Sequence, residues 1–131
     1  EAQRAKLGKL AETPGLRWMG QQKVRVEDYR SADLFVLPSL RDSYGFVFLE
    51  AMSQGLPCVG ADINGMPEII DHGRTGYIVP RSSPAGIAEA VCRYYDDPSN
   101  KQVMAQQAYA RLHELFTWDV VLSKVCSITG V

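Results

Sequence analysis

Short apolar runs and stretches with helical spacing alternate over the first 80 residues of the chain. Residues 33–37 contain a continuous apolar run, which is typical of a parallel strand buried on both faces. The predicted strands are residues 16–19, 33–37, 57–60 and 77–79, and the predicted helices are residues 1–11, 26–32, 46–54 and 67–71. This alternation predicts an α/β fold with a parallel, doubly wound sheet and right-handed crossovers.

Beyond Val79 the pattern predicts helices only. Ser83 followed by Pro84 has the form of an N-cap and a first-turn proline. A second helix is predicted to begin at Pro98, and Thr117 is predicted to cap a last one. Because four strands preceded by a helix are few for an open sheet, we expect further strands on the N-terminal side and regard the chain as part of a larger domain.

The composition indicates a folded domain without a nucleic-acid partner. The 131 residues are 46% hydrophobic, which is enough for a core. Fourteen Lys and Arg residues against 15 Asp and Glu residues give a net charge of -1, so the basic surface that nucleic acids require is absent from the sequence. No apolar stretch approaches the roughly 18 residues of a membrane span, and the first residues lack the apolar core of a signal peptide. We therefore expect a cytoplasmic protein.

Cysteine and histidine spacing gives no sign of a metal site. Cys58, Cys92 and Cys126 lie 34 residues apart each time, which is far from metal-ligand or redox-pair spacing. Each cysteine falls in an apolar pattern and is predicted to be a small buried thiol. Neither His72 nor His113 has a partner at ligand spacing, so we expect no bound metal.

Two polar loops follow the most apolar strands and are predicted to lie at one edge of the sheet. Open α/β sheets bind ligands beyond the carboxyl ends of their strands. The first loop ends at Gly45, directly before a predicted helix, so the N–H groups of the first turn could face an anion such as a phosphate. Simple turn geometry explains the same glycine, and both interpretations stay open at this point.

Two acids near this edge could bind hydroxyl groups. Glu50 lies in a helix that is apolar all round, so it is predicted to be buried and either paired structurally or facing a cleft. Its two oxygens would match a vicinal diol such as a ribose. Asp42 could hold a sugar hydroxyl, or it could simply be a loop aspartate or a helix-capping one. Glu68, in the first turn of the next helix, fits the helix dipole without any function.

Taken together, these motifs resemble the C-terminal, donor-binding domain of the retaining GT-B glycosyltransferases, the glycosyl transferases group 1 family. The family's signature is an acid and a glutamate separated by seven residues, then a Gly-X-Pro strand entry and a Gly-Gly-X-Pro-Glu loop. Here it is found in residues 42–50, 54–57 and 64–68, and the flanking matches are residues 29–33, 37–39, 71–77 and 116–118. The resemblance covers nearly the whole chain. It implies a Rossmann-like doubly wound parallel sheet with C-terminal helices.

Carried over position by position, the resemblance implies roles for individual residues. Glu50 would bind the ribose of a nucleotide sugar and Asp42 the transferred sugar, and these two are the predicted catalytic residues. The predicted donor-binding residues beside the sugar and pyrophosphate are Ser43, Tyr44, Gly45 and Phe46. Two positions depart from the family pattern: Asp42 replaces the usual glutamate and is about one methylene shorter, and Asn64 replaces a glycine but can adopt positive φ.

The resemblance further implies a glycosyltransferase of the hexosyltransferase type. It would move a sugar with retention from a nucleotide diphosphate sugar to a saccharide or glycoconjugate acceptor, as in polysaccharide or lipopolysaccharide biosynthesis, without a metal or other cofactor. Residues 1–131 would be the nucleotide-sugar-binding C-terminal domain without its first strands, and the N-terminal acceptor domain would precede Glu1. That domain would hold the glycan or glycolipid acceptor and provide any peripheral contact with the inner face of a membrane. The chain alone is expected to be inactive.

Two alternatives remain open at the level of the sequence. The first is a non-catalytic Rossmann-like nucleotide-binding or interaction module, which the shorter acid at Asp42 makes conceivable. The second is a related enzyme with the same fold, a nucleotide-sugar epimerase or a glycogen-type synthase.

Overall fold

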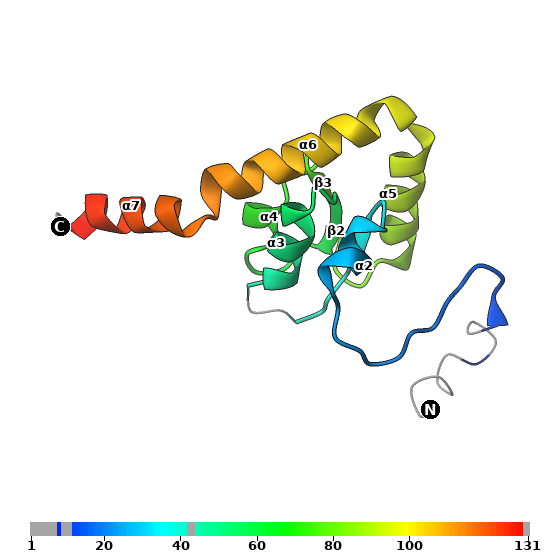
Figure 1. Ribbon diagram of the computed structural model, residues 1–131. Coiled ribbons are helices and arrows are strands. Elements are labelled where there is room, and N and C mark those ends of the chain that lie inside the picture. The colour runs from blue at the N-terminus through cyan, green and yellow to red at the C-terminus, as the bar shows by residue number, and fades with distance from the viewer. Residues whose placement is uncertain (1–7, 9–11, 42–43, 130–131) are drawn as a thin grey trace.

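The computed structural model describes residue 8 and residues 12–41 and 44–129 (Figure 1). In this part of the chain one three-stranded parallel sheet has the order β1–β2–β3, with β1 at Phe35–Leu37, β2 at Cys58–Ala61 and β3 at Gly76–Val79. Helix α2 (Val26–Arg30) precedes the sheet, and α3 (Phe46–Ser53) and α4 (Met66–Ile69) connect its strands. Three further helices follow, α5 (Pro84–Asp96), α6 (Pro98–Leu115) and α7 (Trp118–Thr129).

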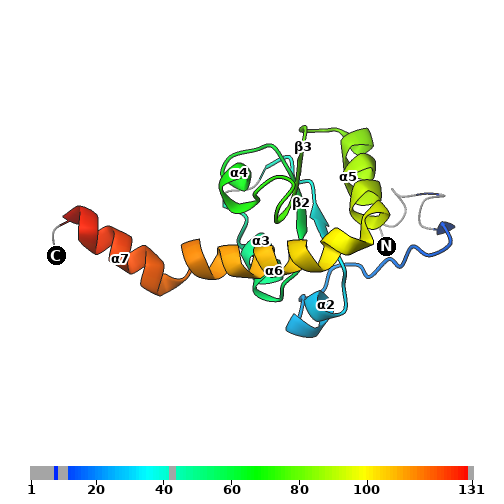
Figure 2. The same ribbon diagram turned by 90° about the horizontal axis from the view of Figure 1, so that it is seen from above.

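Helices cover both faces of the sheet, which confirms the predicted doubly wound arrangement. Helices α3 and α4 lie on one face and α5 lies on the other (Figures 1 and 2). Side chains of β2 alternate between the two faces, as strand geometry requires: Cys58 packs in the cluster of Phe48, and Val59 packs in the cluster of Tyr94. All four residues of β2 are buried. The central strand therefore joins two cores.

Helix α6 connects these cores from the side. Met104 belongs to the core beneath α5, and Ala108, one turn later, belongs to the core beneath α3. The Asp97 side chain caps the start of α6 by accepting a hydrogen bond from the N–H of Asn100. Ser83 caps α5 in the same way, because its Oγ accepts from the N–H of Gly86 at 3.0 Å. The N-cap predicted at Ser83 is confirmed.

The predicted strand at residues 16–19 does not form. This segment has no regular secondary structure, and Leu16 and Met19 are 51% and 48% exposed. A strand needs a neighbouring strand to satisfy its backbone N–H and C=O groups, and in the described residues only β2 pairs with β1. The sheet therefore has three strands here rather than the predicted four. The helix predicted over residues 1–11 lies outside the described residues except for Gly8.

Strand β1 and two of the three cysteines are more exposed than the sequence predicted. Strand β1 is only half-buried, with Val36 37% exposed, because it is an edge strand of the described sheet and α5 packs over the other strands. Cys58 is buried as predicted, whereas Cys92 and Cys126 are exposed. Helix α7, which carries Cys126, extends away from the body and buries none of its residues (Figures 1 and 2).

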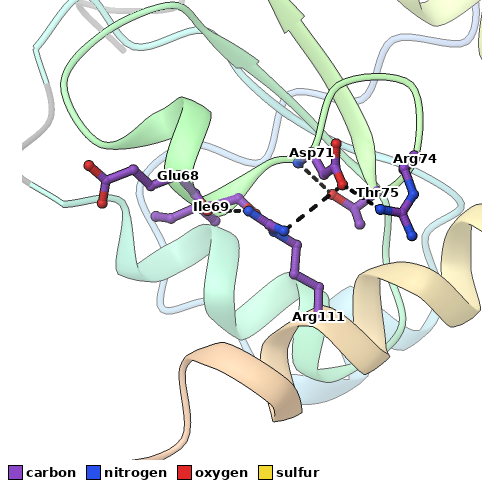
Figure 3. Close-up of polar contacts among 6 residues, drawn as sticks. All are labelled: Glu68, Ile69, Asp71, Arg74, Thr75 and Arg111. Carbon is purple, nitrogen blue, oxygen red and sulfur yellow. Dashed lines mark hydrogen bonds and ion pairs between the residues drawn. The ribbon is translucent and has the colours of Figure 1, made fainter. Parts of the chain in front are cut away.

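Arg111 of α6 fixes the end of α4 (Figure 3). Its Nε donates to the carbonyl oxygen of Ile69 at 2.8 Å, and its Nη2 donates to that of Glu68 at 2.6 Å. The last carbonyls of a helix have no partner within the helix, so one side chain satisfies two of them. Nη1 of Arg111 also lies 3.9 Å from Oδ2 of Asp71, which Arg74 contacts from the solvent side at 3.0 Å. Arg111 thus holds the short helix that follows the second loop.

We expect Arg111→Met to lower the free energy of unfolding of this domain by about 2 kcal/mol, because it removes two charged donors from carbonyls at a helix end. The measurement is the urea dependence of Cys58 alkylation, read by mass spectrometry of its peptide in the full-length protein, since this thiol is fully buried. Arg74→Met is the control. Its partly exposed ion pair to the same Asp71 should change stability by about 0.5 kcal/mol or less. Equal effects of the two variants would contradict the role of Arg111.

Candidate active site

Three loops meet at the carboxyl edge of the sheet. The loop after β1 contacts the loop after β2, because a methyl group on Gly45 would overlap Cε of Met66. The Tyr44 ring lies beside Gly65 of the second loop, 4.0 Å from where a methyl group on that glycine would sit. The loop after β3 joins them through Arg81, whose Nη2 donates to the carbonyl oxygen of Leu40 at 3.2 Å. The edge is therefore a connected surface.

Gly45 opens helix α3 and is itself buried, whereas the next residue, Phe46, is exposed. It is the N-cap, with φ 75° and ψ 41°, a left-handed conformation in which a side chain is strained. Phe48 N–H donates to the carbonyl oxygen of Gly45 at 2.9 Å, while the N–H groups of Phe46 and Val47 have no acceptor in the hydrogen-bond ladder of the helix. The first turn of α3 contains no acidic side chain. This helix end therefore presents a positive potential that favours an anion.

Two aromatic rings flank this helix end. The centroids of Tyr44 and Phe46 lie 5.2 Å apart, and the side chains are 38% and 66% exposed. Exposed ring faces beside an anion-favouring helix end are suited to a ligand that carries both a phosphate and a flat or sugar-like group. The resemblance predicted only that backbone groups of these residues lie near a ligand.

Glu50 is exposed, so the prediction of a buried carboxylate is wrong. Helix α3 buries only Phe48, Ala51 and Met52 against the core and leaves its outer face to solvent. The Oε2 atom of Glu50 accepts a hydrogen bond from the Tyr29 hydroxyl of α2 at 3.0 Å. Burial of the Tyr29 ring, followed by this hydrogen bond, raises the pKa of Tyr29 to about 12, so the hydroxyl stays a donor at neutral pH.

The structure brings several of the predicted site residues together. Tyr44, Gly45 and Phe46 surround the start of α3, and Glu50 lies four residues further along the same helix. Asp42 and Ser43 lie outside the described residues, and their roles stay predictions. In the second loop, Asn64 stands where the family pattern has a glycine, and the sequence indicated that it could adopt a positive φ. Asn64 has φ 44°, the left-handed conformation that a glycine would adopt easily.

Sequence reasoning missed the contact residues that come from distant segments. The sequence predicted only a helix over residues 26–32 around Tyr29, and the acceptor of its hydroxyl lies 21 residues away. Arg111 is separated from Ile69 by 42 residues. Met66, which touches Gly45, was predicted only as part of the second loop. Tyr29 does lie in residues 29–33, which match the family pattern, but this match did not identify its hydrogen-bond partner.

The described residues contain neither a cluster of metal ligands nor a membrane-spanning helix. In residues 12–41 and 44–129, together with Gly8, no group of three or more His, Cys, Asp or Glu side chains could hold a metal ion. Among the same residues, no helix is both long enough and apolar enough to cross a membrane.

Comparison with known sequences identifies relatives over most of the chain. Residues 1–97 match the family model described as glycosyl transferases group 1. An N-acetyl-alpha-D-glucosaminyl L-malate synthase from Bacillus anthracis is 33% identical over 107 residues, which cover 82% of this chain and 28% of that protein. A D-inositol 3-phosphate glycosyltransferase from Streptomyces avermitilis is 34% identical over 110 residues, or 84% of this chain and 23% of that one. The chain thus spans about a quarter of the length of these curated relatives.

Solved structures share the fold. Sucrose-phosphate synthase from Thermosynechococcus elongatus has a TM-score of 0.81 at 23% identity, over 98% of this chain and 34% of that one. A glycosyltransferase from Rickettsia africae has a TM-score of 0.82 at 16% identity, over 95% and 34%. Anabaena HepE, solved in complex with UDP-glucose, has a TM-score of 0.80 at 18% identity, over 99% and 36%. The Rossmann-like fold expected from the resemblance is confirmed, and the match over residues 1–97 shows that the chain belongs to the glycosyl transferases group 1 family.

Proposed function

We propose that this chain is the donor-binding part of a retaining glycosyltransferase that moves a sugar from a nucleotide diphosphate sugar to a saccharide or glycoconjugate acceptor. The observation that carries the proposal is the start of α3, where Gly45 is the N-cap of a helix end that favours an anion, five residues before the exposed carboxylate of Glu50. Membership of the family supports sugar transfer as the reaction. The UDP-glucose complex of HepE supports a nucleotide diphosphate sugar as the donor.

The start of α3 would bind the pyrophosphate of the donor. Negative charge grows on the leaving diphosphate as the bond to the sugar breaks, so donors aimed at those oxygens lower the barrier. The N–H groups of Phe46 and Val47 are such donors and are fixed in place by the helix. We propose that this end supplies the stabilisation without a metal ion, and that the leaving diphosphate helps to deprotonate the acceptor.

The two acids would bind the sugars on either side of the pyrophosphate. A carboxylate accepts two hydrogen bonds from adjacent hydroxyls, which suits Glu50 to the 2′ and 3′ hydroxyls of a ribose. Asp42 would contact the transferred sugar, and Ser43 and Tyr44 would lie beside it. The Tyr44 and Phe46 rings add exposed apolar surface next to this sugar.

The acceptor would bind to a part of the protein that this chain does not cover. The curated relatives are about four times as long as the matched region, which leaves room for an acceptor domain. That domain would hold the glycan or glycolipid and make any contact with the inner face of a membrane. We propose that the protein acts in the cytoplasm in a polysaccharide or lipopolysaccharide type of pathway, and that the 131 residues alone transfer no sugar.

The test is a transfer assay with the full-length protein and radiolabelled UDP, GDP and ADP sugars. A glycosyltransferase should place the label in an acceptor with the anomeric configuration of the donor, read by NMR of the product. An epimerase would instead return a labelled free nucleotide sugar. Asp42→Glu should keep turnover within a modest factor, since it restores the usual acid of the family. A folded full-length protein that binds no nucleotide sugar would contradict the proposal and leave an interaction module.

A further inference from the structure

We propose that Tyr29 is a positioning residue for Glu50: by holding Oε2 it fixes the carboxylate, whose remaining lone pairs accept hydrogen bonds from the two hydroxyls of the donor ribose. The hydroxyl of Tyr29 donates to Oε2 of Glu50 at 3.0 Å. No hydrogen bond from the described residues reaches the second oxygen, Oε1, and the Glu50 side chain is exposed. The inference rests on the proposed function, in which Glu50 binds the ribose.

The core fixes the position of the Tyr29 hydroxyl. The side chain is 7% exposed, although it lies on a helix of only five residues. Its ring packs edge-on against Phe35 of β1, with centroids 5.9 Å apart, and Phe35 packs edge-on against Phe48 of α3 at 5.3 Å. These three rings link α2, β1 and α3. Because Phe48 and Glu50 lie on the same helix, the donor and the acceptor of the hydrogen bond are held by one cluster.

A fixed carboxylate binds hydroxyls better than a mobile one. Restricting the side chain of a glutamate costs conformational entropy. Tyr29 imposes much of this restriction before the ligand arrives, so less is lost when the ligand binds. The raised pKa of Tyr29 keeps its proton on the hydroxyl across the neutral range, so the hydrogen bond persists there.

A neighbouring contact provides a matched control. Arg30, the next residue of α2, donates from its Nε to Oε1 of Gln54 at the end of α3, at 2.9 Å. This hydrogen bond joins the same two helices but does not contact Glu50. Arg30→Met therefore removes an α2–α3 hydrogen bond without changing the carboxylate.

The experiment compares UDP with 2′-deoxy-UDP and 3′-deoxy-UDP by calorimetric titration of the full-length protein, or the corresponding pair of another base if the protein prefers it. Wild type should bind a deoxy nucleotide about tenfold more weakly, or about 1.4 kcal/mol. In Tyr29→Phe this ratio should fall to about twofold, whereas Arg30→Met should keep the wild-type ratio. A merely structural contact would weaken both nucleotides equally and leave the ratio unchanged.

Tyr29→Phe removes one oxygen and leaves the aromatic cluster intact, and alkylation of Cys58 reports whether the domain stays folded. A second variant, with 4-aminophenylalanine at position 29, restores a hydrogen-bond donor. It should recover most of the preference for UDP over the deoxy nucleotides. If Tyr29→Phe kept the roughly tenfold preference for UDP over the deoxy nucleotides while Glu50→Ala lost it, the positioning role would be overturned. The proposed function would still stand. Absence of nucleotide binding, or of any ribose discrimination, in wild type would instead overturn the proposed site and this inference with it.

Discussion

Replacing Gly76 with alanine is expected to destabilise the domain by at least about 3 kcal/mol, the combined scale of backbone strain and overpacking in a rigid core. Gly76 is the first residue of β3 and pairs with Cys58 of β2. A methyl group there would overlap the carbonyl oxygen of Cys58 and lie 2.8 Å from its carbonyl carbon and amide nitrogen. Backbone atoms in a sheet cannot turn aside as a flexible side chain can. The measurement is the urea dependence of Cys58 alkylation in the full-length protein.

Gly73→Ala is the control that distinguishes the cost of this steric clash from the cost of the backbone conformation. Gly73 lies three residues earlier with φ 81°, and no heavy atom lies within 4 Å of an added methyl group. Alanine at this position should cost only the left-handed conformation, about 1 to 2 kcal/mol. If both variants shifted the alkylation curve equally, the close approach of β2 and β3 at Gly76 would be contradicted.

Glu50→Ala should lower kcat/KM for the donor about 100-fold in the full-length protein, because a charged acceptor of two ribose hydroxyls is worth about 3 kcal/mol in total. The exposed carboxylate contributes little to the core, so Cys58 should remain protected from alkylation. The measurement is initial transfer rate against donor concentration. Unchanged kinetics with reduced stability would show that Glu50 serves only as a partner of Tyr29.

Ser53→Ala is the control on the same helix. Its Oγ donates to the carbonyl oxygen of Glu50 at 2.6 Å and accepts from Nε2 of Gln54 at 3.0 Å, so it supports the end of α3 without facing the donor. Its transfer kinetics should match wild type. A loss as large as that of Glu50→Ala would mean that disturbance of α3, rather than a missing ribose contact, lowers the rate.

The central strands and the helix start could be predicted because local sequence determines them. Strand β2 is buried on both faces, so its residues form a continuous apolar run. The position of Gly45 directly before an apolar run identifies the start of α3, and the structure shows this glycine in the left-handed conformation. Ser83 with Pro84 similarly identifies the start of α5. These features depend on residues close together in the chain.

The remaining features depend on distant neighbours. Residues 16–19 are apolar enough for a strand, but pairing, rather than composition, makes a strand. Glu50 was predicted buried because its helix is apolar all round, yet only three residues of the helix are buried, and Val47 and Leu49 pack against the core while partly exposed. The partners of Glu50 and Ile69 lie 21 and 42 residues away, where no local pattern identifies them. These long-range contacts therefore cannot be predicted from local sequence.

Amide hydrogen exchange of the full-length protein, with and without saturating donor nucleotide, tests most directly whether the donor binds at the carboxyl edge. Binding there should slow exchange in peptides that cover residues 44–48 and 62–66. The exchange rates of peptides that cover α5 should not change. Nucleotide binding without slower exchange in either loop would contradict the proposed donor site.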